Sequence, residues 1–272
     1  MDDKNVAEAT AKTEEKSVQK AQKDEASSLN AKDTKAIEEM MEFGMFYGRS
    51  KSRTNPKMKP FIMANRSGFE VIDLEKTIFG IDRVVKAIKD IYEKGGEIVL
   101  VGTSPASKRK IREVGEATNT PYVNERWLGG TLTNFETISK RIKHLRKLKE
   151  QKASGGWEKY TKKEELSFKK ELLKLEKLLG GIEHLNKIPQ MVLIADIYQN
   201  EIPSREARQM GVDVAAIINT DSDPDKTDYI IPANDRSIQS VEYILDIIKE
   251  AIVEAKTKAP KQEAVEDIKK NG

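Results

Sequence analysis

The sequence predicts an α/β fold, a three-layer sandwich in which helices cover both faces of a largely parallel sheet. The first observation is that short apolar runs alternate with amphipathic helical segments. The second is that residues 98–101, 191–195 and 214–218 are almost entirely apolar, as is typical of strands buried on both faces. The third is the length of 272 residues, which is enough for one large domain or two smaller ones.

Both ends of the chain are expected to be disordered tails, over residues 1–35 and 257–272. Few large apolar side chains are present there to offset the entropy that ordering costs. The sandwich domain is predicted over residues 36–133 and 189–256, with a helical insertion between these two parts.

The domain is expected to begin with two short strands, at residues 61–63 and 69–72, which a turn-prone segment joins. Asp73 is the predicted N-cap of the next helix, because its side-chain oxygen can accept a hydrogen bond from a free N–H group of the first turn. Gly95 and Gly96 are expected to end that helix.

The remaining segments continue the alternation of strands and helices. The expected strands are residues 98–101, 121–123, 191–195, 214–218 and, at an edge, 229–231. The expected helices run from about residue 105 to 118, around 204–210 and over 237–253. This order predicts an α/β three-layer flavodoxin-like sandwich with a mostly parallel five-stranded sheet.

Residues 134–188 interrupt the alternation, because they contain no candidate strand. Two helical stretches carry narrow apolar stripes, wide enough for one helix to cover the other. The stripes are Ile138, Ile142, Leu145 and Leu148 in the first stretch, and Leu166, Leu172, Leu175, Leu178 and Leu179 in the second. We therefore expect an α-helical coiled-coil hairpin, inserted between the third and fourth strands.

Composition excludes several kinds of site. Cysteine is absent and there are only two histidines, which argues against disulfides, a thiolate or histidine metal site and a cysteine nucleophile. No apolar run is long enough to span a membrane, and the N-terminus lacks the apolar core of a secretory signal. The expectation is a cytoplasmic protein that needs no metal or cofactor.

Two loops invite comparison with ligand sites. Residues 102–108 follow a strand and precede a helix, but they lack the second glycine of a phosphate-binding loop. Residues 221–225 carry three aspartates, but they lack the glycine and the distal glutamate of a calcium loop. A nucleotide- or phosphometabolite-binding enzyme therefore stays open as an alternative, with its ligand at residues 102–108.

Trp127, Gly129 and Gly130 precede the first helix of the insertion. Trp127 could stack on a base, but a position beside apolar neighbours favours packing in the core. The two glycines allow the backbone to turn, and Thr131 or Thr133 is the expected cap of the helix. We interpret these residues as a structural joint.

Basic residues are unevenly distributed, although the net charge is only +3. No acidic residue lies between Phe43 and Ser67, where a merely solvated surface would normally include some. Such stretches favour contact with a phosphate backbone. The candidate RNA-binding residues are Arg49, Lys51, Arg53, Lys57, Lys59, Arg66, Lys108, Arg109, Lys140, Arg141 and Lys147.

Motifs spread over residues 40 to 253 resemble those of the ribosomal protein S-two family, in its bacterial or organellar form. The matching segments are NPKMKPFI (55–62), IDLEKT (72–77), VN (123–124), RWLGGTLTN (126–134), LLGGI (178–182), REA (205–207), NTDSDPD (219–225) and IPAND (231–235). The chain departs from the family's pattern at Met45 to Ser50, at Glu125 and at Ala233, where histidines or a glycine are usual.

The resemblance implies a non-catalytic constituent of the small ribosomal subunit. Such proteins join the subunit late in assembly, between its head and body, contact small-subunit rRNA and help to hold ribosomal protein S-one. It further implies other small-subunit proteins as partners, and neither a small-molecule substrate nor a membrane.

Overall fold

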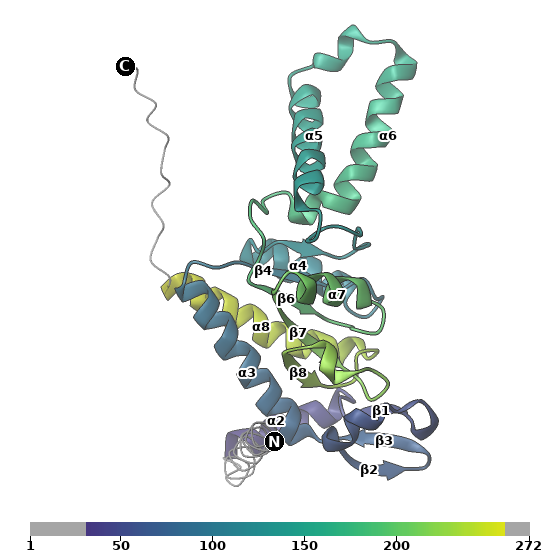
Figure 1. Ribbon diagram of the computed structural model, residues 1–272, viewed down its shortest axis with the longest axis vertical. Helices are drawn as coiled ribbons and strands as arrows, with labels where there is room; N and C mark the ends of the chain where they lie inside the picture. The colour runs from purple at the N-terminus through teal and green to yellow at the C-terminus, as the bar shows by residue number, and fades with distance from the viewer. Residues whose placement is uncertain (1–30, 259–272) are drawn as a thin grey trace, which may run out of the picture. The chain divides into compact units, whose positions relative to one another are not determined.

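The computed structural model describes residues 31–258, and the chain divides into two compact units, residues 1–42 and 43–272 (Figure 1). In the first unit the described element is helix α2 (Ala31–Glu42). It begins before residue 36, where the tail was expected to end, because its Ala, Lys and Glu residues are good helix formers despite a low apolar content. The rest of both predicted tails, apart from residues 257 and 258, lies outside the described residues.

The second unit contains a five-stranded parallel sheet, as predicted. Its strands are β4 (Ile98–Val101), β5 (Tyr122–Val123), β6 (Met191–Ile194), β7 (Asp213–Ile218) and β8 (Tyr229–Pro232). They lie in the order β5-β4-β6-β7-β8, and every neighbouring pair is parallel. This is the flavodoxin-like strand order, in which the chain changes direction across the sheet between β4 and β6.

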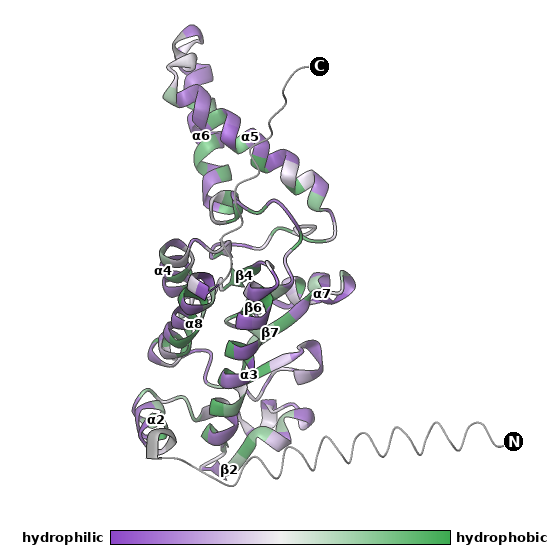
Figure 2. Ribbon diagram, turned by 90° about the vertical axis from the view of Figure 1, so that its left-hand side faces the viewer, coloured by the Kyte–Doolittle hydropathy of each residue, from purple (hydrophilic) through white to green (hydrophobic). Residues whose placement is uncertain are grey.

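Helices cover both faces of this sheet and confirm the three-layer prediction. Helices α3 (Leu74–Glu93), α4 (Lys108–Thr118) and α8 (Ile238–Lys258) pack together on one face, and α7 (Glu201–Gln209) contacts β6 and β7 on the other. Figure 2 shows α4 and α8 on one side of the strands and α7 on the opposite side. Asp73 caps α3 as predicted, by accepting a hydrogen bond from the Glu75 N–H.

Three short strands before α3 form a separate antiparallel sheet in the order β1-β3-β2. They are β1 (Tyr47–Ser50), β2 (Ile62–Arg66) and β3 (Phe69–Ile72). Between β1 and β2 lie two 3₁₀ turns, η2 (Lys51–Arg53) and η3 (Pro56–Phe61). The sequence predicted strands near β2 and β3 but none at β1, since β1 is stabilised by pairing with a strand about twenty residues away rather than by a local pattern.

The insertion forms a helical hairpin of α5 (Phe135–Ala153) and α6 (Lys162–Leu179), which contact each other. It lies between β5 and β6, the second and third strands of the parallel sheet, one strand earlier than expected. The α5 stripe is buried throughout, but Leu166 of the predicted α6 stripe is 53% exposed. Near the turn, Trp157 and Phe168 pack against each other instead. Coiled-coil packing along this hairpin stays a prediction.

The segment that leads into α5 is organised by a buried carboxylate. Glu206 of α7 accepts hydrogen bonds from the backbone N–H groups of Gly130 and Leu132, at 2.8 and 3.0 Å, and from the indole N–H of Trp127 at 3.3 Å. The predicted cap was wrong: the N-cap is Asn134, and the Thr131 hydroxyl donates to the Leu128 carbonyl instead. A residue over seventy positions away thus satisfies backbone donors of the segment that precedes α5.

Trp127 is 5% exposed, and Gly130 adopts a φ of +89°, which an L side chain rarely tolerates. A Cβ on Gly129 would meet no neighbouring atom within 4 Å. Only the second glycine of the pair is therefore required by backbone geometry.

Candidate nucleic-acid interface

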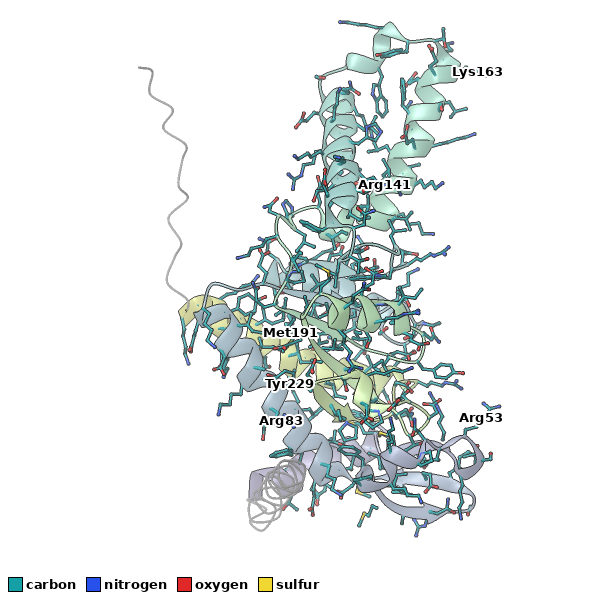
Figure 3. All side chains as sticks on the ribbon, in the orientation of Figure 1. Arg53, Arg83, Arg141, Lys163, Met191 and Tyr229 are labelled. Atoms are coloured by element: carbon teal, nitrogen blue, oxygen red, sulfur yellow. The ribbon has the colours of Figure 1, made fainter. Side chains whose placement is uncertain are left out.

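The predicted RNA-binding residues lie on the three-stranded sheet with its 3₁₀ turns, and on helices α4 and α5. In Figure 3, Arg53 marks the first region and Arg141 the second. Because a cation that already holds a carboxylate must give it up to bind a phosphate, we sort these residues by their partners.

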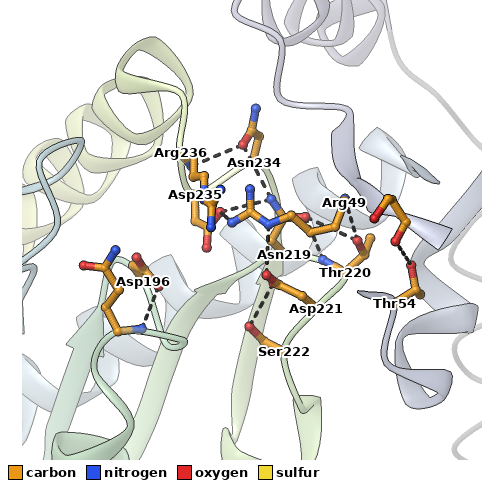
Figure 4. Close-up of polar contacts among 12 residues, drawn as sticks. Arg49, Thr54, Asp196, Asn219, Thr220, Asp221, Ser222, Asn234, Asp235 and Arg236 are labelled. Carbon is orange, nitrogen blue, oxygen red and sulfur yellow. Dashed lines mark hydrogen bonds and ion pairs between the residues drawn. The ribbon is translucent and has the colours of Figure 1, made fainter. Parts of the chain in front are cut away.

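Arg49 is bound in a buried ion-pair network, contrary to its expected role as an open RNA contact. Its Nε donates to Asp221 at 2.9 Å and its Nη2 donates to Asp235 at 2.6 Å (Figure 4). The Arg49 side chain is only 13% exposed, and its backbone N–H donates to the Thr220 hydroxyl. Arg49 therefore attaches β1 to the loops that follow β7 and β8, and it is not open to a phosphate.

The carboxylates around Arg49 outnumber it. Burial first, and then the negative charge of Asp196, raise the pKa of Asp235 to about 6, although Arg49 opposes the shift. Burial also raises the pKa of Asp196. The network thus favours protonation of a buried aspartate.

Lys57 is exposed but also paired. Its ammonium lies 2.5 Å from an Asp225 oxygen and 3.1 Å from an Asp223 oxygen. Hydrogen bonds to Asp225 and then Asp223 raise the pKa of Lys57. With Asp221 bound to Arg49, all three aspartates of the suspected cation loop face basic side chains of the same chain. Among residues 31–258, no group of three or more His, Asp or Glu residues is arranged to hold a metal ion.

Three further candidates on α4 and α5 have acidic partners. Lys108 lies 2.7 Å from Glu125 and lowers the pKa of that carboxyl. Arg109 pairs with Glu242, and Lys140 pairs with Glu136 one turn earlier on the same helix. Such exposed pairs contribute little stability, so these cations are hindered as RNA contacts but not excluded.

The other candidates are exposed and have no acidic partner within the described part of the chain. They are Lys51, Arg53, Lys59 and Arg66 near the three-stranded sheet, and Arg141 and Lys147 on α5. We call the first four residues the open cationic surface. Lys143, which the sequence interpretation did not select, is likewise exposed, and it shares with Lys147 the side of α5 opposite the buried stripe.

Exposed apolar side chains lie among these cations. Met63 is 75% exposed and Phe69 is 55% exposed. Phe69 lies directly opposite Arg66 in the β2–β3 ladder, so both side chains are on one face of the sheet. The sequence interpretation missed these residues, although aromatic residues interleaved with basic ones are a recognisable signal of RNA binding.

The loop at residues 102–108, which was compared with a phosphate-binding loop, is filled by the protein's own side chains. The hydroxyls of Ser104 and Ser107 lie 2.9 Å apart and both residues are buried. A Cβ on Gly102 would approach Ser107 and Ile111 within 3 Å. Helix α4 begins at Lys108 rather than near residue 105, because residues 104–107 form a separate turn.

The fold and these exposed cations define a class of α/β protein with basic side chains, unpaired among the described residues, around its small antiparallel sheet. Within residues 31–258, no helix is both long and apolar enough to cross a lipid bilayer. Comparison with known proteins then specifies the family. The family described as "Ribosomal protein S2" matches residues 40–255, and the chain belongs to it.

Relatives agree with this assignment. The chain is 40% identical, over 232 residues, to the small ribosomal subunit protein uS2 of Chlorobaculum parvum, covering 85% of this chain and 92% of the relative. It is equally similar to the protein of the same name from Chlorobaculum tepidum, covering 93% of that relative. Members of the family are structural proteins, so the enzyme alternative was wrong.

Proposed function

We propose that this chain is a structural component of the small ribosomal subunit, where it binds small-subunit rRNA and supports late assembly. Family membership and the names of both relatives support the place in the subunit. The single observation that supports RNA binding is the open cationic surface, whose four basic side chains are exposed and unpaired among the described residues.

Unpaired cations are the stronger RNA contacts for a physical reason. Each phosphate that a lysine or arginine neutralises releases counterions. The slope of log affinity against log salt concentration then becomes more negative by about 0.7 to 0.9. Lys57 gains less, because its ammonium leaves Asp223 and Asp225 in order to reach a phosphate. Arg49 already holds Asp221 and Asp235, so its role is to hold β1 in place rather than to contact a phosphate.

The four cations themselves are suited to recognising the shape and charge of the RNA backbone. The four cations lie on two 3₁₀ turns and a hairpin strand, so no helix presents them in one row for a groove. On α5, Lys140, Lys143 and Lys147 repeat every three or four residues on one face, which suits a second contact with a phosphate backbone.

Sedimentation of ribosomal particles through a sucrose gradient tests the proposal. The chain is expected in the small-subunit fraction, and a variant with Lys51, Arg53 and Lys59 changed to Gln is expected to be depleted from it. The matched control changes Lys89, Lys169 and Lys226, which are paired cations elsewhere in the chain. Absence of the unaltered chain from small subunits at every salt concentration would reject the proposal.

Docking of ribosomal protein S-one is a further part of the proposal, supported by the resemblance of the motifs. Subunits reconstituted without this chain are expected to retain less ribosomal protein S-one, and adding the chain back is expected to restore it. Equal retention in both preparations would limit the role of the chain to rRNA binding.

A further inference from the structure

A pocket of about 320 Å³ lies between the 3₁₀ turns and one face of the three-stranded sheet. Its volume is at the lower end of the range for small-molecule sites, which fits one nucleotide rather than a longer segment. Its lining combines cations, apolar side chains and a carboxylate. The lining residues that bear on its chemistry are Lys51, Lys59, Ile62, Met63, Asn65 and Glu70.

Glu70 is the unusual member of this lining. It is only 8% exposed, on the central strand β3, and its carboxylate has no hydrogen bond or ion pair among the described residues. Asn65 lies directly opposite Glu70 in the ladder, so both side chains share a face. The Glu70 oxygens keep some access to solvent through the pocket, so they are free to accept hydrogen bonds from a ligand there.

The two lysines add a second feature. Lys51 and Lys59 line the same pocket, are exposed and pair with no described acidic residue. The pocket therefore presents an acceptor inside and cations at its exposed edge, with Ile62 and Met63 as apolar wall. A ligand that matches it has N–H donors on a flat apolar ring, and a negative charge at one end.

We propose that this pocket holds one unpaired nucleotide of the rRNA, with the base inside and its phosphate at Lys51 and Lys59. Glu70 accepts hydrogen bonds from the base, and Ile62 and Met63 contact its face. Guanine fits best, because its ring imino and exocyclic amino groups offer two parallel donors to the two carboxylate oxygens. The inference rests on the proposed rRNA binding and assigns one base-specific contact within it.

Glu70→Gln tests the pocket through the sign of its effect on rRNA affinity. If the surface acts by charge alone, removing a negative charge strengthens binding. If Glu70 accepts from a base, the same change weakens binding by about tenfold, the size expected for a lost hydrogen bond to a charged group. The matched control is Glu75→Gln, which removes an exposed carboxylate five residues away and is expected to leave affinity equal or higher.

The measurement is filter binding of the full chain to purified small-subunit rRNA, together with thermal unfolding. Glu70→Gln is expected to unfold at about the same temperature, because the Glu70 carboxylate makes no hydrogen bond or ion pair with the described residues that the substitution would remove. Binding as tight as in the unaltered chain, or an unfolding temperature lowered by the substitution, would overturn the pocket while leaving rRNA binding intact. Failure of the unaltered chain to bind rRNA would reject the proposed function itself.

Competition with free nucleotides identifies the base and separates RNA from a free metabolite. Guanosine monophosphate is expected to compete with rRNA at lower concentration than uridine monophosphate, and Glu70→Gln is expected to abolish the difference. Equal competition by both nucleotides would overturn the assignment of the base. Binding of guanosine monophosphate without any effect on rRNA affinity would reassign the pocket to a free nucleotide and overturn the proposal.

Discussion

Replacing Arg49 with Met should lower the stability of the folded protein. The residues that contact RNA should stay in place. The substitution keeps the aliphatic stem but leaves Asp221 and Asp235 without the guanidinium that holds both of them. Asp235 is 1% exposed, so its carboxylate cannot turn to water. Breaking a buried ion pair from one side costs about 3–5 kcal/mol, which lowers Tm by about 10 °C in a domain of this size.

The assay is thermal unfolding of Arg49→Met beside Arg53→Met, an exposed and unpaired arginine of the neighbouring turn. We expect Arg49→Met to lower Tm strongly, and Arg53→Met to leave Tm nearly unchanged but to weaken rRNA binding. Affinities are compared at a temperature where both variants are folded.

A second substitution sharpens the prediction. Adding Asp235→Asn to Arg49→Met should recover part of the lost stability, because the carboxylate left unpaired is replaced by a neutral amide. An Arg49→Met variant with unchanged Tm and lost rRNA affinity would refute the reasoning and return Arg49 to the interface.

Three further predictions concern pH, charge and the backbone. The pKa of Asp235 is about 6 in the folded protein against an ordinary 3.8, so the folded state binds more protons between these values. The free energy of unfolding should therefore fall by about 2 kcal/mol as pH rises from 4 to 7, and Asp235→Asn should flatten this profile in urea titrations; stability that rises over that range would contradict it. Lys59→Gln should reduce the salt slope of rRNA binding by about one, and Lys57→Gln by less, because Lys57 is paired; equal slopes would show that pairing does not matter. Gly130→Ala should destabilise by about 1–2 kcal/mol because of its positive φ, whereas Gly129→Ala should be neutral in the same denaturant series; equal effects would contradict the geometry.

Local patterns predicted the parallel sheet well, because a strand buried on both faces carries its signal in its own residues. The runs at 98–101 and 191–195 became β4 (Ile98–Val101) and β6 (Met191–Ile194). By contrast, β1 (Tyr47–Ser50) was missed, because its sequence carries no alternation and its strand character comes from pairing with β3.

The predicted threonine cap of α5 was wrong for a related reason. A threonine was the natural local cap by sequence preference, but Glu206 from α7 takes the backbone donors of Gly130 and Leu132. The helix begins after Asn134, and a buried acceptor on a distant helix organises the segment before it, which no window of neighbouring residues reveals.

The sequence by itself determined the fold class, the family and the concentration of basic residues between Phe43 and Ser67. Only the tertiary structure decided which of those cations are open. The partners of Lys57 and Arg49 are separated from them by 166 to 186 residues, and folding brings them within 3.1 Å. Because the electrostatic energy of a pair depends on distance through space and on burial, an acid-free stretch of sequence does not establish an acid-free environment.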